Sequence, residues 1–177
     1  EPHGLRIDPG GRTAYIALLK GKGIGFLDTI SDTLTIGNLD GEAVQGGVTP
    51  NGVFTFASLY DTKELALFNL ESKLVKYIKL PTSSRGPIQM YPTPDSKFVY
   101  LADQGYYFGQ PTGNLVYKID LETASVVKEI KTGNAPHGIV VSKDGKFVYV
   151  TNLLSGDLSV IDTSTDMEIA KIPLGKE

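Results

Sequence analysis

Residues 135–152 read Ala135-Pro-His-Gly-Ile-Val-Val-Ser-Lys-Asp-Gly-Lys-Phe-Val-Tyr-Val-Thr-Asn152, and two further apolar runs follow, at 158–162 and 167–172. Each run is about five residues long and rich in β-branched and aromatic residues, which is typical of strands. Asp144-Gly145 separates the first two runs. This dipeptide predicts a tight hairpin, because glycine adopts a positive φ without steric cost. The stretch therefore predicts four consecutive antiparallel strands.

The same pattern occurs four times along the chain. A turn is followed six residues later by an aromatic residue, with turn and aromatic at 9 and 15, 50 and 56, 94 and 100, and 143 and 149. In the first, second and fourth repeats, an Asp or Asn comes 13 residues after the aromatic, at Asp28, Asn69 and Asp162. In the third repeat, Asp120 comes 20 residues after the aromatic. Four short strands in each repeat of about 44 residues match a β-propeller blade.

The fold class that we predict is therefore all-β. It is a single β-propeller unit of four tandem four-stranded antiparallel blades, at approximately 1–42, 43–85, 86–134 and 135–177. The aromatic residues of the repeats are expected to pack between blades, and the recurring Asp and Asn to close turns onto their own backbone, with calcium binding as the alternative.

Tyr149-Val-Thr-Asn152 and its surroundings resemble the YVTN-type β-propeller repeat. The other repeats match less well, with Tyr15-Ile-Ala-Leu18, Phe56-Ala-Ser-Leu59 and Tyr100-Leu-Ala-Asp103 at this place. The resemblance implies blades around a central channel. It also implies a bacterial or archaeal protein that is periplasmic, secreted or at the cell surface.

Composition excludes several classes of function. The 177 residues carry a net charge of −3, which disfavours nucleic acid as a partner. Cysteine is absent, so disulfides, thiolate zinc sites and iron–sulfur clusters are excluded. No apolar stretch approaches the roughly 18 residues of a membrane helix, so we expect no membrane insertion. The opening Glu1-Pro2-His3-Gly4 indicates a mature or excised segment.

Four blades leave two blade faces to be covered, one at each end of the array. The unit could be part of a longer propeller, half of an eight-bladed ring of two copies, or a closed four-bladed ring. We expect the apolar residues of the end faces, such as Ile24 and Phe26 or Leu158 and Val160, not to remain exposed. A protein partner or self-association is therefore predicted.

Candidate binding residues gather on one face of the predicted propeller. His3 and His137 occupy equivalent Pro-His-Gly positions at the channel mouth, either as metal or cofactor ligands or as turn residues that hydrogen-bond the adjacent backbone. The long loop of the third repeat carries Tyr106, Tyr107 and Phe108, either as a contact surface or as a plug over the channel. Arg85, like Arg6, lies near an inner strand, where it could face an anionic ligand or solvent.

No Ser/His/Asp set or metal-ligand cluster can be assembled around these residues, so we predict no catalytic residue and no metal site. The function predicted is a non-catalytic binding or structural module without a cofactor. The alternative is a redox-associated propeller that binds a d1-type haem or accompanies a quinoprotein dehydrogenase.

Overall fold

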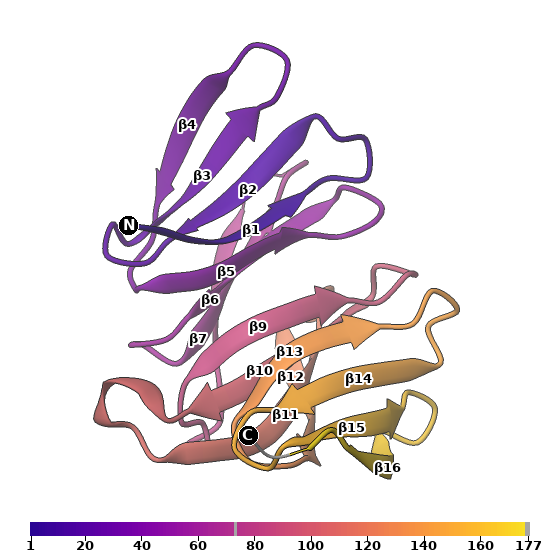
Figure 1. Ribbon diagram of the computed structural model, residues 1–177. Coiled ribbons are helices and arrows are strands. Elements are labelled where there is room, and N and C mark those ends of the chain that lie inside the picture. Colours follow the sequence, from indigo (N-terminus) through magenta and orange to yellow (C-terminus); the bar gives the residue numbers. More distant parts are fainter. Residues whose placement is uncertain (73, 176–177) are drawn as a thin grey trace.

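The computed structural model describes residues 1–72 and 74–175, without the side chain of Phe108. It contains four antiparallel sheets of four strands, and each sheet is built from four consecutive strands (Figure 1). The innermost strands β1, β5, β9 and β13 come first in their sheets, and the chain then runs outward in each. The prediction of an all-β propeller with four-stranded blades is confirmed.

The strands follow the repeats. The first blade contains β1 (Pro2–Ile7), β2 (Thr13–Leu18), β3 (Gly23–Asp28) and β4 (Thr33–Asn38). The second contains β5 (Ala43–Val48), β6 (Phe54–Leu59), β7 (Glu64–Asn69) and β8 (Val75–Lys79). The third contains β9 (Pro87–Pro92), β10 (Phe98–Gly105), β11 (Thr112–Asp120) and β12 (Ser125–Lys131). The fourth contains β13 (Pro136–Val141), β14 (Phe147–Asn152), β15 (Asp157–Asp162) and β16 (Met167–Pro173).

A single 3-10 turn, η1 (Tyr107–Gly109), is the one helical element of the described chain. No helix in residues 1–72 or 74–175 is long and apolar enough to span a membrane.

The hairpin between β13 and β14 shows why the turn signature recurs. Gly145 has a φ of 74°, and its N–H donates to the carbonyl of Ser142 at 2.9 Å. The carboxylate of Asp144 accepts hydrogen bonds from the Ser142 hydroxyl and the Lys146 N–H. The second and third blades have the same hydrogen bond from a hydroxyl to the side-chain oxygen two residues later, from Thr49 to Asn51 and from Thr93 to Asp95. The side chains therefore fix the inner hairpins of the second, third and fourth blades locally.

The recurring Asp and Asn after the third strand of each blade also close turns, as predicted. The carboxylate of Asp28 accepts hydrogen bonds from the backbone N–H groups of Ser31 and Ile30, which lower the pKa of Asp28 to about 2. Asn69, Asp120 and Asp162 accept the equivalent backbone bonds.

Apolar side chains fill the spaces between neighbouring blades. Tyr15 packs in the cluster between the first and second blades, Phe56 between the second and third, and Tyr100 between the third and fourth. These three aromatic residues are at most 5% exposed. Tyr149, at the same position of the fourth blade, is only partly buried. Its difference follows from its place at the end of the array, where no further blade covers it.

A polar contact supplements the apolar core between the third and fourth blades. The Lys118 ammonium lies 2.9 Å from both carboxylate oxygens of Asp166, and the Tyr100 hydroxyl donates to the same carboxylate at 2.9 Å. Lys118 also lies over the ring of Phe98, 4.5 Å from its centroid. Most of this pair is shielded from solvent, so the contact ties the two blades together in a fixed register.

The blades form an open array. Neighbouring inner strands pack in the order β1, β5, β9 and β13, but no described strand of the first blade packs on one of the fourth (Figure 1). The alternative of a closed four-bladed ring is therefore wrong for this chain. Our expectation for the end faces also needs correction at the first blade. Ile24 is fully buried there, and Phe26 packs beside it against the second blade. The exposed face is the opposite one.

Candidate functional site

A cavity of about 280 Å³ lies at one mouth of the channel, where inner strands begin and loops of the first three blades converge. Its volume is near the lower end of the range for small-molecule sites. Its lining combines apolar side chains, two histidines and two glutamines: Glu1, His3, Leu19, Val44, Tyr60, Ile88, Gln89, Gln104, Tyr107 and His137. The structure thus brings His3, His137 and Tyr107 together, as their predicted position on one face requires.

His137 is held by two glutamine side chains. Its Nδ1 lies 2.5 Å from Oε1 of Gln104, and its Nε2 lies 3.4 Å from Nε2 of Gln89. An amide oxygen only accepts hydrogen bonds, so Nδ1 carries the proton and Nε2 keeps its lone pair. Burial, together with the charge of nearby His3, lowers the pKa of His137. The imidazole is therefore neutral near pH 7 and can accept a proton at Nε2.

Gln104 is completely buried, yet its Nε2 has no hydrogen-bond partner within the described part of the chain. Leaving a buried donor unsatisfied costs about 1–3 kcal/mol, so such groups need an explanation. Gln104 lines the cavity, but its Nε2 is shielded from solvent, so a carbonyl oxygen of a bound molecule accepts this N–H only after a small shift of the amide. The amide would then orient His137 with its oxygen and the ligand with its nitrogen.

His3 has a different environment from His137. His3 is exposed, and its Nδ1 donates to the backbone carbonyl of Val44 at 2.8 Å. This contact is not the bond to adjacent backbone that a turn histidine would make, because Val44 lies 41 residues away in the second blade. The two repeat-equivalent histidines therefore do not form a symmetric pair, and His137 is the better candidate for chemistry.

The aromatic loop lies beside the cavity. Tyr106 and Tyr107 are 48% and 44% exposed, and their rings meet edge to face with centroids 5.3 Å apart. The Tyr60 hydroxyl donates to the Tyr107 backbone carbonyl at 2.7 Å and so fixes the loop at its base. The Phe108 side chain lies outside the described part of the structure. Since Tyr107 lines the cavity, this loop forms part of its wall.

Replacing Tyr106 and Tyr107 together by serine is expected to change the free energy of unfolding by less than about 1 kcal/mol. Both rings are largely exposed, and the bond from Tyr60 is to the backbone, which the change retains. Urea denaturation followed by circular dichroism measures the difference. A large loss of stability would mean that the loop belongs to the hydrophobic core.

Arg85 does not line this cavity; its side chain is exposed at the protein surface. Its backbone N–H donates at 2.8 Å to the carboxylate of Asp103, which also accepts from Ser84 and Gly86. Asp103 is completely buried, and that burial raises its pKa. The segment at Arg85 is thereby fixed to β10, next to Gln104. Arg6 lines a separate cavity at the other mouth of the channel and lies 5.8 Å from the centroid of the Tyr91 ring.

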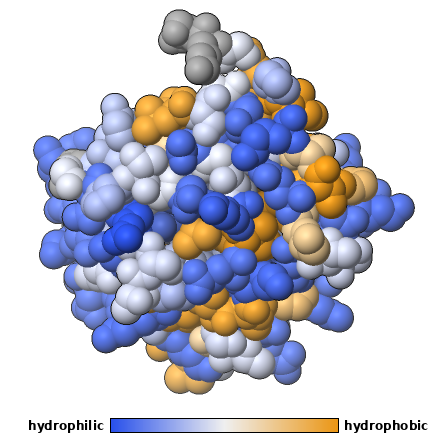
Figure 2. Space-filling model, turned by 90° about the horizontal axis from the view of Figure 1, so that it is seen from below, coloured by the Kyte–Doolittle hydropathy of each residue, from blue (hydrophilic) through white to orange (hydrophobic). Residues whose placement is uncertain are grey.

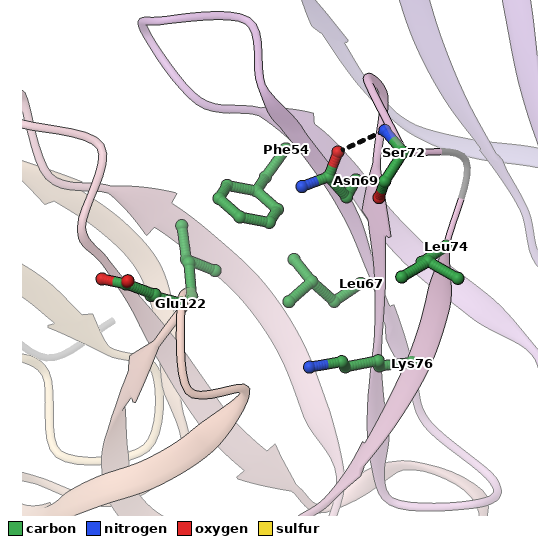
Figure 3. Close-up of a pocket in the computed structure, with 8 residues that line it drawn as sticks. Phe54, Leu67, Asn69, Ser72, Leu74, Lys76 and Glu122 are labelled. Atoms are coloured by element: carbon green, nitrogen blue, oxygen red, sulfur yellow. Dashed lines mark hydrogen bonds between the residues drawn. The ribbon is translucent and has the colours of Figure 1, made fainter.

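A third cavity, between the second and third blades, holds no catalytic set. Figure 3 shows Phe54 and Leu67 pointing into it, with Lys76 and Glu122 at its sides. Asn69 turns away to accept the Ser72 N–H at 2.9 Å, its role in the turn. Across the described ranges, no three His, Asp or Glu side chains gather in a way that could hold a metal ion.

Three residues of the channel-mouth site escape the sequence pattern. Gln104 lies in the longer third repeat. Gln89 occupies the position at which repeats one and four have glycine, and Tyr60 directly follows strand β6. Gln45 and Gln89 recur one residue after the histidine position, a signal that could have pointed to polar groups there.

Residues 65–177 match the family model described as Arylesterase. The human protein named serum paraoxonase/arylesterase 2 is 26% identical over 149 residues, which is 70% of this chain and 41% of that protein. Hydrazine synthase from Kuenenia stuttgartiensis superposes with a TM-score of 0.84 over 97% of this chain and 48% of its own, at 22% identity. A protein of unknown function from Desulfotomaculum acetoxidans gives a TM-score of 0.75 over 92% and 51%, at 17% identity.

The two solved structures are similar in fold, and the chain spans about half their length. The sequence-based prediction that the protein is not an enzyme is wrong, because the matching family and the human relative are both named for hydrolase activity. The match covers well over half of the residues and includes all of the third and fourth blades. The chain belongs to the arylesterase family.

Proposed function

We propose that the cavity at the channel mouth hydrolyses small aryl esters, with His137 as the general base. The observation that carries the proposal is the geometry of His137 in a chain of this family. The imidazole is oriented by Gln104 at Nδ1, and partial burial keeps it neutral. Within the described part of the chain, its unprotonated Nε2 has one protein neighbour, the side-chain amide of Gln89 at the long distance of 3.4 Å, which leaves room for a water molecule to compete for the lone pair. A general base needs this combination of fixed orientation and a lone pair available near neutral pH.

In the proposed reaction, a water molecule attacks the ester carbonyl carbon while His137 Nε2 takes its proton. The negative charge that develops on the carbonyl oxygen is stabilised by the N–H of Gln104 that has no partner in the described structure. The bond to the aryloxide then breaks, and the proton passes from the imidazolium to the leaving oxygen. One water is consumed, and a carboxylic acid and a phenol are released.

The apolar part of the cavity suits an aryl group. Leu19, Val44 and Ile88 form an apolar cluster with Tyr60 beside the two histidines. An aromatic ring that packs there removes its own apolar surface from water, which favours binding. The charged residue in this lining is Glu1, at the cavity edge and in a salt bridge with Lys20.

Phenyl acetate is the probe for this proposal. The purified chain is expected to release phenol at a rate that saturates with substrate, with ethyl acetate hydrolysed less efficiently because it lacks the ring. Val44→Phe should raise KM or abolish the activity, because Val44 is buried in the cavity wall. Val127→Phe is the matched control, since Val127 is exposed on the third blade outside the cavity. Hydrolysis that does not saturate, or that Val44→Phe leaves unchanged, would contradict the proposal.

Other predictions from the sequence stay open. The YVTN-type assignment of the repeats, a location outside the cytoplasm and the haem alternative remain predictions. A Soret band in the absorption spectrum of the purified protein would favour the haem alternative over the hydrolase proposed here.

A further inference from the structure

One charged residue lies in the interior of the protein. Hydrophilic residues cover much of the face shown in Figure 2, where charged side chains contact water. Among the Asp, Glu, Lys and Arg residues that the structure describes, only Asp103 is fully buried. The same repeat position holds Leu18 in the first blade, Leu59 in the second and Asn152 in the fourth. A blade therefore forms without a carboxylate here, and burying one is costly unless it is well hydrogen-bonded.

The Asp103 carboxylate holds the segment that leads into the third blade. It accepts hydrogen bonds from the Ser84 hydroxyl at 2.7 Å and from the backbone N–H groups of Arg85 and Gly86, both at 2.8 Å. Burial raises the pKa of Asp103, and these bonds oppose that effect because they stabilise the charged form. The donors directly precede the inner strand β9, which carries Gln89 of the cavity lining. Asp103 thus ties the end of β10 to the start of β9.

The backbone ladder does not set the position of Gln104. The pairing of β10 is irregular on both sides of Asp103: with β9 between Leu101 and Asp103, and with β11 between Asp103 and Gly105. Opposite Asp103 on β9 lies Pro87, which has no N–H to donate. Irregularities of this kind redirect side chains and are frequent beside active sites. Gln104 lies within the irregular stretch, so the bonds of the Asp103 side chain replace ladder bonds in fixing it.

The same carboxylate supports the aromatic wall of the cavity. A Cβ added at Gly86 would overlap the ring of Tyr60, so the Gly86 backbone lies directly against that ring. The Tyr60 hydroxyl in turn donates to the Tyr107 carbonyl at 2.7 Å. The Gly86 carbonyl accepts the N–H of Gly105 at 3.2 Å, which closes the connection back to β10. Fixing Gly86 through Asp103 therefore fixes its contacts on both sides.

We propose that Asp103 is a positioning residue, which holds Gln104 where its amide oxygen accepts the Nδ1 proton of His137. Asp103 is not part of the cavity lining, so it acts through Gln104 and not on a bound molecule. The bond from Nδ1 to Gln104 selects one tautomer of the neutral imidazole. If Gln104 is released, both tautomers become populated. The effect on catalysis rests on the hydrolase function proposed above, whereas the effect on the tautomer does not.

Nuclear magnetic resonance tests the tautomer without any substrate. The variant Asp103→Asn keeps the size of the side chain but replaces one accepting oxygen by a donating amide. A long-range proton–nitrogen correlation spectrum at about pH 8 distinguishes the two neutral tautomers of a histidine. The chain has two histidines, and His3→Gln assigns their signals. We expect His137 to carry its proton on Nδ1 in the unmodified chain and to show a mixture of tautomers in Asp103→Asn.

Two further variants keep this test decisive. Thr55→Val is the matched control: Thr55 is completely buried, donates to the Gly47 carbonyl and lies outside the cavity lining. It should leave the tautomer unchanged. Ser84→Ala removes one bond to Asp103 and should shift the tautomer in the same direction as Asp103→Asn, to a smaller extent. Circular dichroism verifies that each variant folds, and Ser84→Ala decides the question if Asp103→Asn does not fold.

Kinetics with phenyl acetate separate positioning from a purely structural role. Asp103→Asn should lower kcat about 10–100-fold, because the base is misaligned, and change KM less than about threefold. Gln104→Leu should lower kcat at least as much; Leu19 occupies the equivalent position in the first blade. In the Gln104→Leu background, Asp103→Asn should cause less than about a further twofold loss, because both changes act through one amide.

An unchanged His137 tautomer in folded Asp103→Asn would overturn the proposal. Losses of kcat that multiply in the double variant would also overturn it, since Asp103 would then act independently of Gln104. If the tautomer shifts as expected but the unmodified chain does not hydrolyse phenyl acetate, the proposed hydrolase function is wrong and the positioning of His137 through Asp103 stands.

Discussion

Tyr100→Ala is expected to lower the free energy of unfolding by about 3–5 kcal/mol, the range for truncating a large buried aromatic. Tyr100 is completely buried between the third and fourth blades, and its ring packs with Val116 and Val148. The change also leaves Asp166 without the hydroxyl that donates to it at 2.9 Å. Burial and the nearby Asp166 carboxylate raise the pKa of Tyr100, so the hydroxyl remains a donor at all ordinary pH values. The midpoint and slope of urea denaturation give the measurement.

Tyr149→Ala is the control for this result. The repeat alone predicts the same cost for both tyrosines, but Tyr149 is only partly buried in the single chain. In dilute solution its truncation should cost about 1 kcal/mol. Equal costs for Tyr100 and Tyr149 would contradict the difference in their burial.

The fold could be predicted from the sequence because each blade repeats its local chemistry. Asp144 with Gly145 fixes a hairpin through bonds within five residues, and Asp28 closes its turn with the two N–H groups that follow it closely. Such signals do not depend on the rest of the chain. The alternation of apolar residues, by contrast, fixes which residues share a face but not the neighbour that the face meets. For that reason the sequence pattern places Ile24 on the outer end face of the first blade, whereas the structure places it on the face that packs against the second blade.

The site was only partly predictable, because its polar contacts join distant segments. The repeat places His3 and His137 at the same mouth, which the structure shows. Gln104 reaches His137 across 33 residues, and the Tyr60 hydroxyl meets the Tyr107 carbonyl across 47. No local pattern specifies such pairs. The prediction of a non-enzymatic role rests on the lack of a Ser/His/Asp set, and a single half-buried imidazole oriented by an amide is not found by a search for such a set.

His137→Gln is expected to reduce kcat for phenyl acetate by about 10²–10⁴-fold, the usual contribution of a general base. Glutamine keeps a polar side chain of similar length, but it cannot accept a proton from water at neutral pH. Thermal unfolding monitored by circular dichroism should show that the variant still folds. His3→Gln is the matched control, with a loss at least tenfold smaller, because His3 donates to a backbone carbonyl in an exposed position.

The pH dependence distinguishes a catalytic His137 from a structural one. Burial lowers the pKa of His137 below its usual value of 6.5, so less of the imidazole is protonated at any given pH than in an exposed histidine. The kcat/KM for phenyl acetate should therefore fall toward low pH as one group is protonated, with the midpoint of the fall below pH 6.5. In His137→Gln this fall should disappear, leaving a flat residual rate. A profile whose midpoint lies above pH 6.5, or one that is unchanged in the variant, would show that another group is the base.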